Sequence, residues 1–144
     1  PHQSIVESLY VIRNILNTQE CYAICEKENG IAIGVIELIL NAQTDITERD
    51  NECELGYWLG KPFWNKGYMS EAVREMLRHG FNDLAMNTIW CRYYEGNERS
   101  KRVQEKAGFI YHHTCFNVPV TQLNTNRTSI VNIMTKEQWN NIYK

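Results

Sequence analysis

The sequence predicts one α+β domain in which a mixed, mostly antiparallel sheet is flanked by helices. Three observations carry this prediction. Runs rich in β-branched and aromatic residues alternate with segments whose apolar residues recur at helical spacing. The pair Asn29-Gly30 separates two β-rich runs, which is the strongest short hairpin signal. The 144 residues are one domain's worth of sequence, with no internal repeat or linker.

The N-terminal third is expected to form a helix followed by a hairpin. Ser4 can cap a helix that ends near Asn17. Its apolar residues at helical spacing are Ile5, Leu9, Ile12 and Leu16. Two antiparallel strands, residues 21–27 and 31–40, follow around the Asn-Gly turn. Residues 41–51 are polar, without periodicity and partly acidic, so we expect a solvent-exposed loop there.

The remaining two thirds alternate between strands and helices. Strands are expected over residues 52–59, 88–94, 109–116 and 128–134. Helices are expected over residues 70–84, 97–107 and 136–143. Gly108 closes the second of these helices as a left-handed cap, and Thr135 with Gln138 forms a capping box for the last. The expected order is therefore α-β-β-β-α-β-α-β-β-α.

Charge and hydropathy exclude several classes of protein. Fifteen Lys and Arg against 17 Asp and Glu give a net charge of −2, so no global positive field would gather nucleic acid. The longest apolar run, residues 31–36, is far shorter than the roughly 18 residues of a membrane-spanning helix. We therefore expect a soluble protein that binds neither membrane nor, directly, nucleic acid.

The five cysteines are odd in number and scattered, which is typical of reduced thiols in a cytoplasmic protein. Cys21 and Cys25 are four residues apart, but no second pair follows at zinc-site spacing, so no metal is assigned. The adjacent His112 and His113 are expected to face opposite ways in a strand, and so not to form one site by themselves.

The turn before the helix over 70–84 is a candidate anion site. The strand over 54–59 leads through Gly60 and Gly67 into that helix. Such a turn leaves backbone N–H groups unpaired at the positive end of the helix dipole, where a pyrophosphate can bind. A plain turn is the alternative. The segment has neither the P-loop nor the dinucleotide-binding glycine pattern.

A second candidate lies on the helix over 97–107. Asn97, Ser100 and Gln104 fall on one stripe and form a polar line beside an otherwise core-seeking element. The alternative is that Asn97 only caps the helix.

Together these segments resemble the GNAT superfamily of N-acetyltransferases, in its ribosomal-protein-alanine acetyltransferase branch. The resemblance covers roughly residues 20 to 140 and is carried by Glu54-Leu-Gly-Tyr-Trp-Leu59, Trp64-Asn-Lys-Gly67-Tyr-Met-Ser-Glu-Ala72, Asn97-x-x-Ser100-x-x-Val103-x-Glu-Lys-x-Gly108-Phe109 and Thr135-Lys-Glu-Gln-Trp139. It implies a three-layer α/β/α fold in which a parallel strand pair, residues 52–59 and 88–94, splays apart. It also implies a strand and a helix upstream of residue 1, so we expect the chain to be a fragment of a single acetyltransferase domain.

The resemblance implies acetyl-CoA as cosubstrate. The backbone of Tyr57, Trp58 and Leu59 is expected to pair with the pantetheine arm, and Asn97 to hydrogen-bond the cofactor. The pyrophosphate is expected on the backbone amides of Asn65, Lys66, Gly67, Tyr68, Met69 and Ser70. Trp64 and Met69 depart from the family pattern, and Met69 places a larger side chain where the backbone approaches phosphate.

The resemblance also implies the catalytic groups. Ser100 holds the position from which a hydroxyl can protonate the departing CoA thiolate, a role that many relatives give to Tyr. Glu54 is the candidate base and Glu52 its rival, whereas both could instead be exposed acids at a strand entrance. An amide near Trp58 could stabilise the oxyanion. No acyl-enzyme is needed, and Cys53 and Cys91 are expected to be buried structural thiols, because neither has a sequence neighbour that would lower its pKa.

These features predict an acetyl-CoA-dependent N-acetyltransferase that acts on a protein N-terminus or a small-molecule amine by direct attack in a ternary complex. The alternative is a non-catalytic acyl-CoA-binding regulatory module of the same fold. A third reading, RNA binding, would use basic residues of the helix over 97–107, but these alternate with acids and read more simply as a solvated face. Homodimers are common in the branch, so a homodimer is also an expectation.

Overall fold

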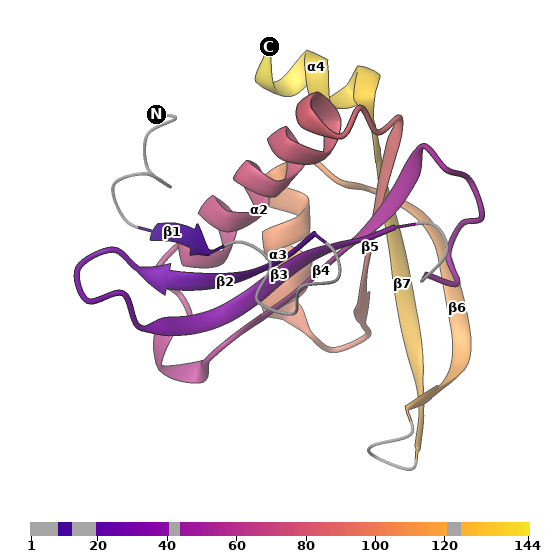
Figure 1. Cartoon of the computed structure of the whole chain (residues 1–144). Coiled ribbons are helices and arrows are strands. Elements are labelled where there is room, and N and C mark those ends of the chain that lie inside the picture. Colours follow the sequence, from indigo (N-terminus) through magenta and orange to yellow (C-terminus); the bar gives the residue numbers. More distant parts are fainter. Residues whose placement is uncertain (1–8, 13–19, 41–43, 121–124) are drawn as a thin grey trace.

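The computed structural model describes residues 9–12, 20–40, 44–120 and 125–144 (Figure 1). Its seven strands form one sheet in the order β1-β2-β3-β4-β5-β7-β6. Neighbouring strands are antiparallel except β4 and β5, which are parallel. The prediction of a mixed, mostly antiparallel sheet is therefore confirmed.

The elements alternate along the described chain as follows. The strands are β1 (Leu9–Ile12), β2 (Glu20–Glu26), β3 (Ala32–Leu40), β4 (Glu52–Leu59), β5 (Thr88–Tyr94), β6 (Ile110–Val120) and β7 (Thr125–Thr135). The helices are α2 (Tyr68–Arg78), α3 (Glu98–Ala107) and α4 (Lys136–Tyr143), with a 3-10 turn at Lys61–Phe63 and a π-helical turn at His79–Asp83. The predicted bounds of β4, β5 and α4 are confirmed residue for residue.

The N-terminal helix is a wrong prediction where the structure describes it. Leu9–Ile12 is a strand, antiparallel to β2, with Leu9 opposite Glu26 and Ile12 opposite Ala23. The reason is physical: the apolar spacing fitted a helix, but β-branched residues also suit a strand, and pairing with β2 decides between them. The other residues of that prediction, 4–8 and 13–17, lie outside the described residues.

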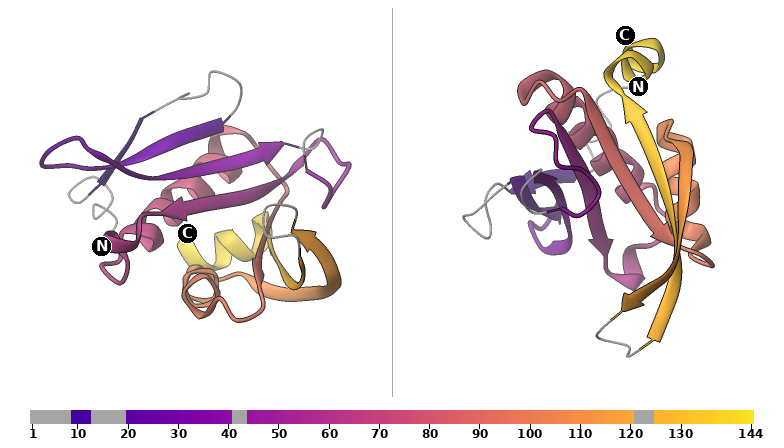
Figure 2. Two further views of the ribbon diagram at one scale, coloured as in Figure 1. Left: turned by 90° about the horizontal axis from the view of Figure 1, so that it is seen from below. Right: turned by 90° about the vertical axis from the view of Figure 1, so that its right-hand side faces the viewer.

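The three helices gather on one side of the curved sheet (Figure 2). α2 buries its apolar stripe, including Val73 and Leu77, and the core continues into Phe81 of the π-helical turn. The Phe81 ring stacks on Trp139 of α4 with centroids 5.5 Å apart, which ties α4 to the end of α2. Among the described residues, no helix is long and apolar enough to span a membrane.

The parallel strands β4 and β5 separate in the middle of the sheet. They pair from Glu52 opposite Thr88 to Leu55 opposite Cys91, and no further. Beyond Leu55, β4 remains paired with β3 as far as Leu59, while β5 remains paired with β7 as far as Tyr94. A slot therefore opens beside Gly56, Tyr57 and Trp58, in agreement with the splayed strand pair that the family resemblance implies.

A β-bulge corrects the expectation about the two adjacent histidines. The pairing of β6 with β7 shifts between Tyr111 and His113, so strict alternation is broken there. The Nδ1 atoms of His112 and His113 lie 2.7 Å apart, and both rings lie edge-on to the Trp90 ring. The two imidazoles thus face the same neighbour and form one cluster, contrary to the prediction.

Candidate active site

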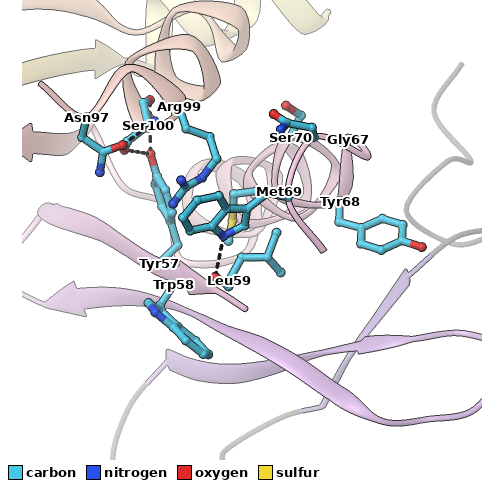
Figure 3. Close-up of a pocket in the computed structure, with 12 residues that line it drawn as sticks. Tyr57, Trp58, Leu59, Gly67, Tyr68, Met69, Ser70, Asn97, Arg99 and Ser100 are labelled. Atoms are coloured by element: carbon cyan, nitrogen blue, oxygen red, sulfur yellow. Dashed lines mark hydrogen bonds between the residues drawn. The ribbon is translucent and has the colours of Figure 1, made fainter. Parts of the chain in front are cut away.

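One pocket at the slot collects most of the residues that the sequence singled out (Figure 3). β4 contributes Tyr57, Trp58 and Leu59, and the start of α3 contributes Asn97 and Ser100. The turn before α2 and its first residues supply Trp64, Asn65, Gly67, Tyr68, Met69 and Ser70. Lys66 and Glu54 are not in this lining. Sequence positions far apart are thus brought to one cavity.

The N-terminus of α2 forms one end of the pocket. Gly67 is its N-cap residue, in the left-handed region at φ 81°, and no side chain caps the helix. Asn65, two residues earlier, is also left-handed, at φ 63°. The first amides of α2 are therefore available to an anion, and the helix dipole favours one.

The Met69 side chain does not fill this anion site. It is buried in the hydrophobic core with Ala72 and Val73 of the same helix. The departure from the family pattern at this position is therefore accommodated on the core side of α2.

Trp64 and Arg99 build a wall of the pocket that sequence reasoning missed. The Trp64 indole donates to the carbonyl oxygen of Leu59 at 2.9 Å. The guanidinium carbon of Arg99 lies 3.2 Å from the centroid of the Trp64 ring, in the range of a stacked cation–π contact. Figure 3 shows Arg99 extending from α3 into the pocket, whose lining also includes Gly67 and Ser70 at the α2 terminus. In the sequence Arg99 looks like one more charge on a solvated helix face.

Two hydroxyls from different elements meet in the middle of the slot. The hydroxyl oxygens of Tyr57 and Ser100 are 2.5 Å apart, and either can be the donor. The Gln104 amide donates to Tyr57 at 3.0 Å and to Ser100 at 3.2 Å. The Asn132 amide in turn donates to Gln104 Oε1 at 2.8 Å, which fixes the orientation of the Gln104 amide.

This network leaves one hydroxyl proton to spare. The Gln104 amide has two N–H groups for three acceptors, because the carbonyl oxygen of Arg92 also lies 3.2 Å from it. One O–H forms the bond between Tyr57 and Ser100, and the other has the long contact of 3.5 Å from the Tyr57 hydroxyl to the Ser100 carbonyl oxygen. Burial raises the pKa of Tyr57, so its hydroxyl stays protonated at neutral pH. The pair can therefore donate one hydrogen bond to a group bound in the slot.

Asn97 and Ser129 complete the slot on the side of β5. The Asn97 side chain caps α3 by accepting from the Ser100 amide at 3.1 Å, as the capping alternative predicts. Asn97 also lines the neighbouring compartment, with Gly56, Arg92 and Ser129. Ser129 is 1% exposed, and its hydroxyl has no hydrogen-bond partner in the described structure.

The two candidate bases are buried and already hydrogen-bonded, so the alternative that they are exposed acids is wrong. Glu54 is 5% exposed and accepts from Thr44 at 2.6 Å and from Arg92 at 2.6 and 3.1 Å. Glu52 is 6% exposed and accepts from Thr47 at 2.7 Å and from Trp90 at 2.9 Å. Buried carboxylates are held in such networks, and removing a partner is costly.

The cysteines beside the slot are held as thiols. Burial is the largest cause that raises the pKa of Cys53, to about 12, and that of Cys91. A thiol is a nucleophile only as thiolate, so neither cysteine is activated. In the described residues no group of three or more His, Cys, Asp or Glu side chains is placed to hold a metal ion.

Comparison with known proteins agrees with this geometry. Residues 3–110 match the acetyltransferase (GNAT) domain family. A Bacillus subtilis protein whose provisional name is ribosomal N-acetyltransferase YdaF is 32% identical over 82 residues, which cover 57% of this chain and 42% of that protein. An uncharacterized N-acetyltransferase, p20 of Bacillus licheniformis, is 30% identical over 88 residues, which cover 61% of this chain and 47% of that protein. The chain thus spans less than half the length of these relatives.

Solved structures share the fold. A ribosomal-protein-S5-alanine acetyltransferase from Vibrio fischeri superposes with a TM-score of 0.72 at 20% identity, over 86% of this chain and 65% of that chain. A GNAT-family acetyltransferase from Bacillus anthracis superposes with a TM-score of 0.67 at 22% identity, over 82% of this chain and 67% of that one. The family match covers most of the sequence, and the splayed strands and the uncapped α2 terminus fit it. The chain therefore belongs to the GNAT acetyltransferase domain family.

Proposed function

We propose that this chain carries out acetyl-CoA-dependent N-acetylation of a primary amine, by direct attack in a ternary complex. The single observation that carries the proposal is the slot between β4 and β5. It has an uncapped helix terminus at one end and a hydroxyl pair with a spare proton in its wall. These are the two features that binding a pyrophosphate thioester and releasing a thiol require.

The residues present fit acetyl-CoA. The amides from Asn65 to Ser70 would hold the pyrophosphate, and Arg99 on Trp64 would add a cation beside it. The β4 edge over Tyr57, Trp58 and Leu59, which β5 leaves unpaired, would hold the pantetheine arm as an added strand partner. When bound, acetyl-CoA supplies the activated acetyl thioester.

The chain's own groups would then position the two substrates and protonate the leaving thiolate. The Tyr57 and Ser100 pair holds a proton beside the place of the leaving sulfur, and Gln104 keeps both hydroxyls oriented. A backbone N–H near Trp58 would stabilise negative charge on the carbonyl oxygen. Glu54 stays a candidate base, although its carboxylate is engaged by Arg92. Positioning and electrostatics carry most of the rate.

The acceptor is a primary amine, either a protein N-terminus or a small molecule. The loop between β3 and β4 carries Asp45, Glu48 and Asp50, and its acidic character favours a cationic acceptor, while Asp45 itself pairs with Arg92 at 2.7 Å. The five cysteines are free thiols, which fits a reducing compartment such as the cytoplasm.

Turnover tests the proposal. Acetyl-CoA binding is measured by calorimetry, followed by CoA release with N-terminal peptides and small amines. Binding with amine-dependent CoA release supports the proposed function. Binding without release over the whole panel favours the regulatory acyl-CoA-binding module instead, and no binding refutes both.

A further inference from the structure

Glu37 is a half-buried carboxylate on the sheet face opposite the helices. It lies in the middle of β3, opposite Cys21 of β2 and Gly56 of β4. No described residue donates a hydrogen bond to it or forms an ion pair with it. Its negative charge is one cause that raises the pKa of the neighbouring Cys21 thiol, after burial. Among the described residues, Glu37 is therefore a charge without a partner at a partly desolvated position.

The other two carboxylates on this face of the sheet are engaged. Glu54 is bound by Arg92 and Thr44, and Glu52 by Thr47 and Trp90. Arg92 is also shared with Asp45, at 2.7 Å. An incoming cation would have to displace these partners to reach Glu52 or Glu54. Glu37 needs no such displacement.

Glycine at position 56 places Glu37 beside the slot. Gly56 lines the compartment that also contains Arg92 and Ser129. A Cβ atom at Gly56 would lie 3.6 Å from Glu37 Oε2, so the carboxylate reaches the backbone of β4 where the slot begins. Because Gly56 carries no side chain, nothing on β4 covers Glu37 at this point.

Two further side chains at the slot, Trp58 and Ser129, have no hydrogen-bond partner among residues 9–12, 20–40, 44–120 and 125–144. Trp58 is two residues beyond Gly56, is 64% exposed, and in Figure 3 points away from Tyr57 toward the side of β3. An exposed indole beside a carboxylate is suited to the carbon skeleton and charge of an amine cation. Ser129, across the slot, is a buried hydroxyl that a polar ligand group would satisfy.

We propose that Glu37 binds the protonated amine of the acceptor and accepts its proton, with Trp58 covering the adjoining apolar part. The inference rests on the proposed function and names the acceptor class, a cationic primary amine on an apolar body. The ammonium gives one proton to the Glu37 carboxylate, which leaves a neutral amine with a lone pair. The new C–N bond forms as the C–S bond breaks.

The remaining protons balance. The nitrogen loses its second proton as the amide forms, and the departing sulfur gains one from the Tyr57 and Ser100 pair, which that second proton then replenishes. Glu37 returns its proton to solvent. The sum is one ammonium and one thioester giving one amide, one thiol and one released proton. A carboxylate next to the amine would be repelled by Glu37, so free amino acids are poor acceptors.

The test uses the full chain with 2-phenylethylamine as the probe and L-phenylalanine as the same body with an added carboxylate. Glu37→Gln is expected to weaken binding of 2-phenylethylamine to the CoA-saturated protein at least tenfold, with acetyl-CoA affinity within about twofold of the original. In turnover, KM for the amine rises about tenfold and kcat/KM falls about 100-fold, within the range of a lost general base. Glu37→Asp is expected to recover part of the lost amine affinity and part of the lost kcat/KM.

The matched control is Glu28→Gln, which removes the same charge from the exposed turn of the same hairpin and is expected to change neither quantity. Failure of 2-phenylethylamine to bind, a preference for L-phenylalanine, or equal behaviour of Glu37→Gln and the control would overturn the assignment. If Glu37→Gln and Glu28→Gln had the same amine affinity and kcat/KM while the protein still released CoA, the proposed function would stand and only the role of Glu37 would be refuted. A protein that does not bind acetyl-CoA would refute the proposed function itself.

Discussion

The hydroxyl oxygens of Tyr57 and Ser100 lie 2.5 Å apart although one residue is on β4 and the other on α3. The Gln104 amide, also on α3, lies within hydrogen-bond distance of both, so β4 and α3 together fix one hydroxyl pair in the wall of the slot. The hydrogen bond between them couples the two hydroxyls, so a change at one affects the proton of the other.

The first prediction concerns this pair. Tyr57→Phe and Ser100→Ala are each expected to lower kcat about 10- to 100-fold, because each removes one member of a donor unit. The double variant should lose little more than either single one, since residues that act as a unit are not additive. CoA release at saturating acetyl-CoA and amine measures this. Fully additive losses would show that the two hydroxyls act separately.

The second prediction concerns Arg99. Arg99→Ala is expected to weaken acetyl-CoA binding about tenfold, because it removes the cation that stacks on Trp64 in the pocket that the α2 terminus also lines. The loss should shrink as salt is raised. Arg102→Ala is the matched control, since Arg102 is exposed on the same helix and lines neither compartment of the slot. Calorimetric titration of the two variants compares them, and equal affinities would remove Arg99 from the site.

The third prediction concerns the packing of β3 against β4. A Cβ atom at Gly34 would collide with the backbone oxygen of Trp58, whereas one at Gly56 would meet only ordinary contacts. Gly34→Ala is expected to lower the free energy of unfolding by about 1–3 kcal/mol, the usual cost of overpacking. Gly56→Ala, in the next strand, should cost far less. Denaturant unfolding of both variants measures the difference, and equal costs would contradict the close approach.

The fourth prediction concerns alkaline pH. Burial raises the pKa of Cys53 to about 12, while a thiol in the unfolded chain titrates near about 8.5. Between these values the unfolded state binds fewer protons, so stability present below about pH 8.5 is lost as pH rises toward 12. The slope from this one group is at most about 1.4 kcal/mol per pH unit. Cys53→Ala should flatten the curve relative to Cys115→Ala, a less buried cysteine; parallel curves would contradict this origin.

Much of the fold could be predicted because its signals are local. The Asn29-Gly30 turn and the capping box of Thr135 with Gln138 each act within a few residues, and both are present. Leu9–Ile12 was mispredicted because its apolar spacing also fits a helix, and pairing with β2 is a long-range effect. The bulge before His113 left no recognisable signal either, since it depends on the register against β7.

The candidate site also has a part that could be predicted from the sequence and a part that could not. The α2 terminus and the stripe of Asn97 and Ser100 could be found from spacing, because each lies on one element. The contact of Tyr57 with Ser100, the Arg99 stack and the Arg92 bridge to Glu54 join side chains from separate elements. Contacts between side chains of separate elements cannot be predicted from residue spacing alone. A favoured base such as Glu54 can therefore turn out to be engaged by a partner.

The claim that the slot binds acetyl-CoA is tested most directly by titrating the full chain with acetyl-CoA. The chemical shifts of the backbone amides are measured at each step of the titration. We expect saturable changes that are largest at Tyr57 to Leu59, on the splayed edge of β4, and at Asn65 to Ser70, in the turn before α2 and its first residues. Saturable binding with its largest changes elsewhere, or no binding, would contradict the assignment of the slot as the acetyl-CoA site.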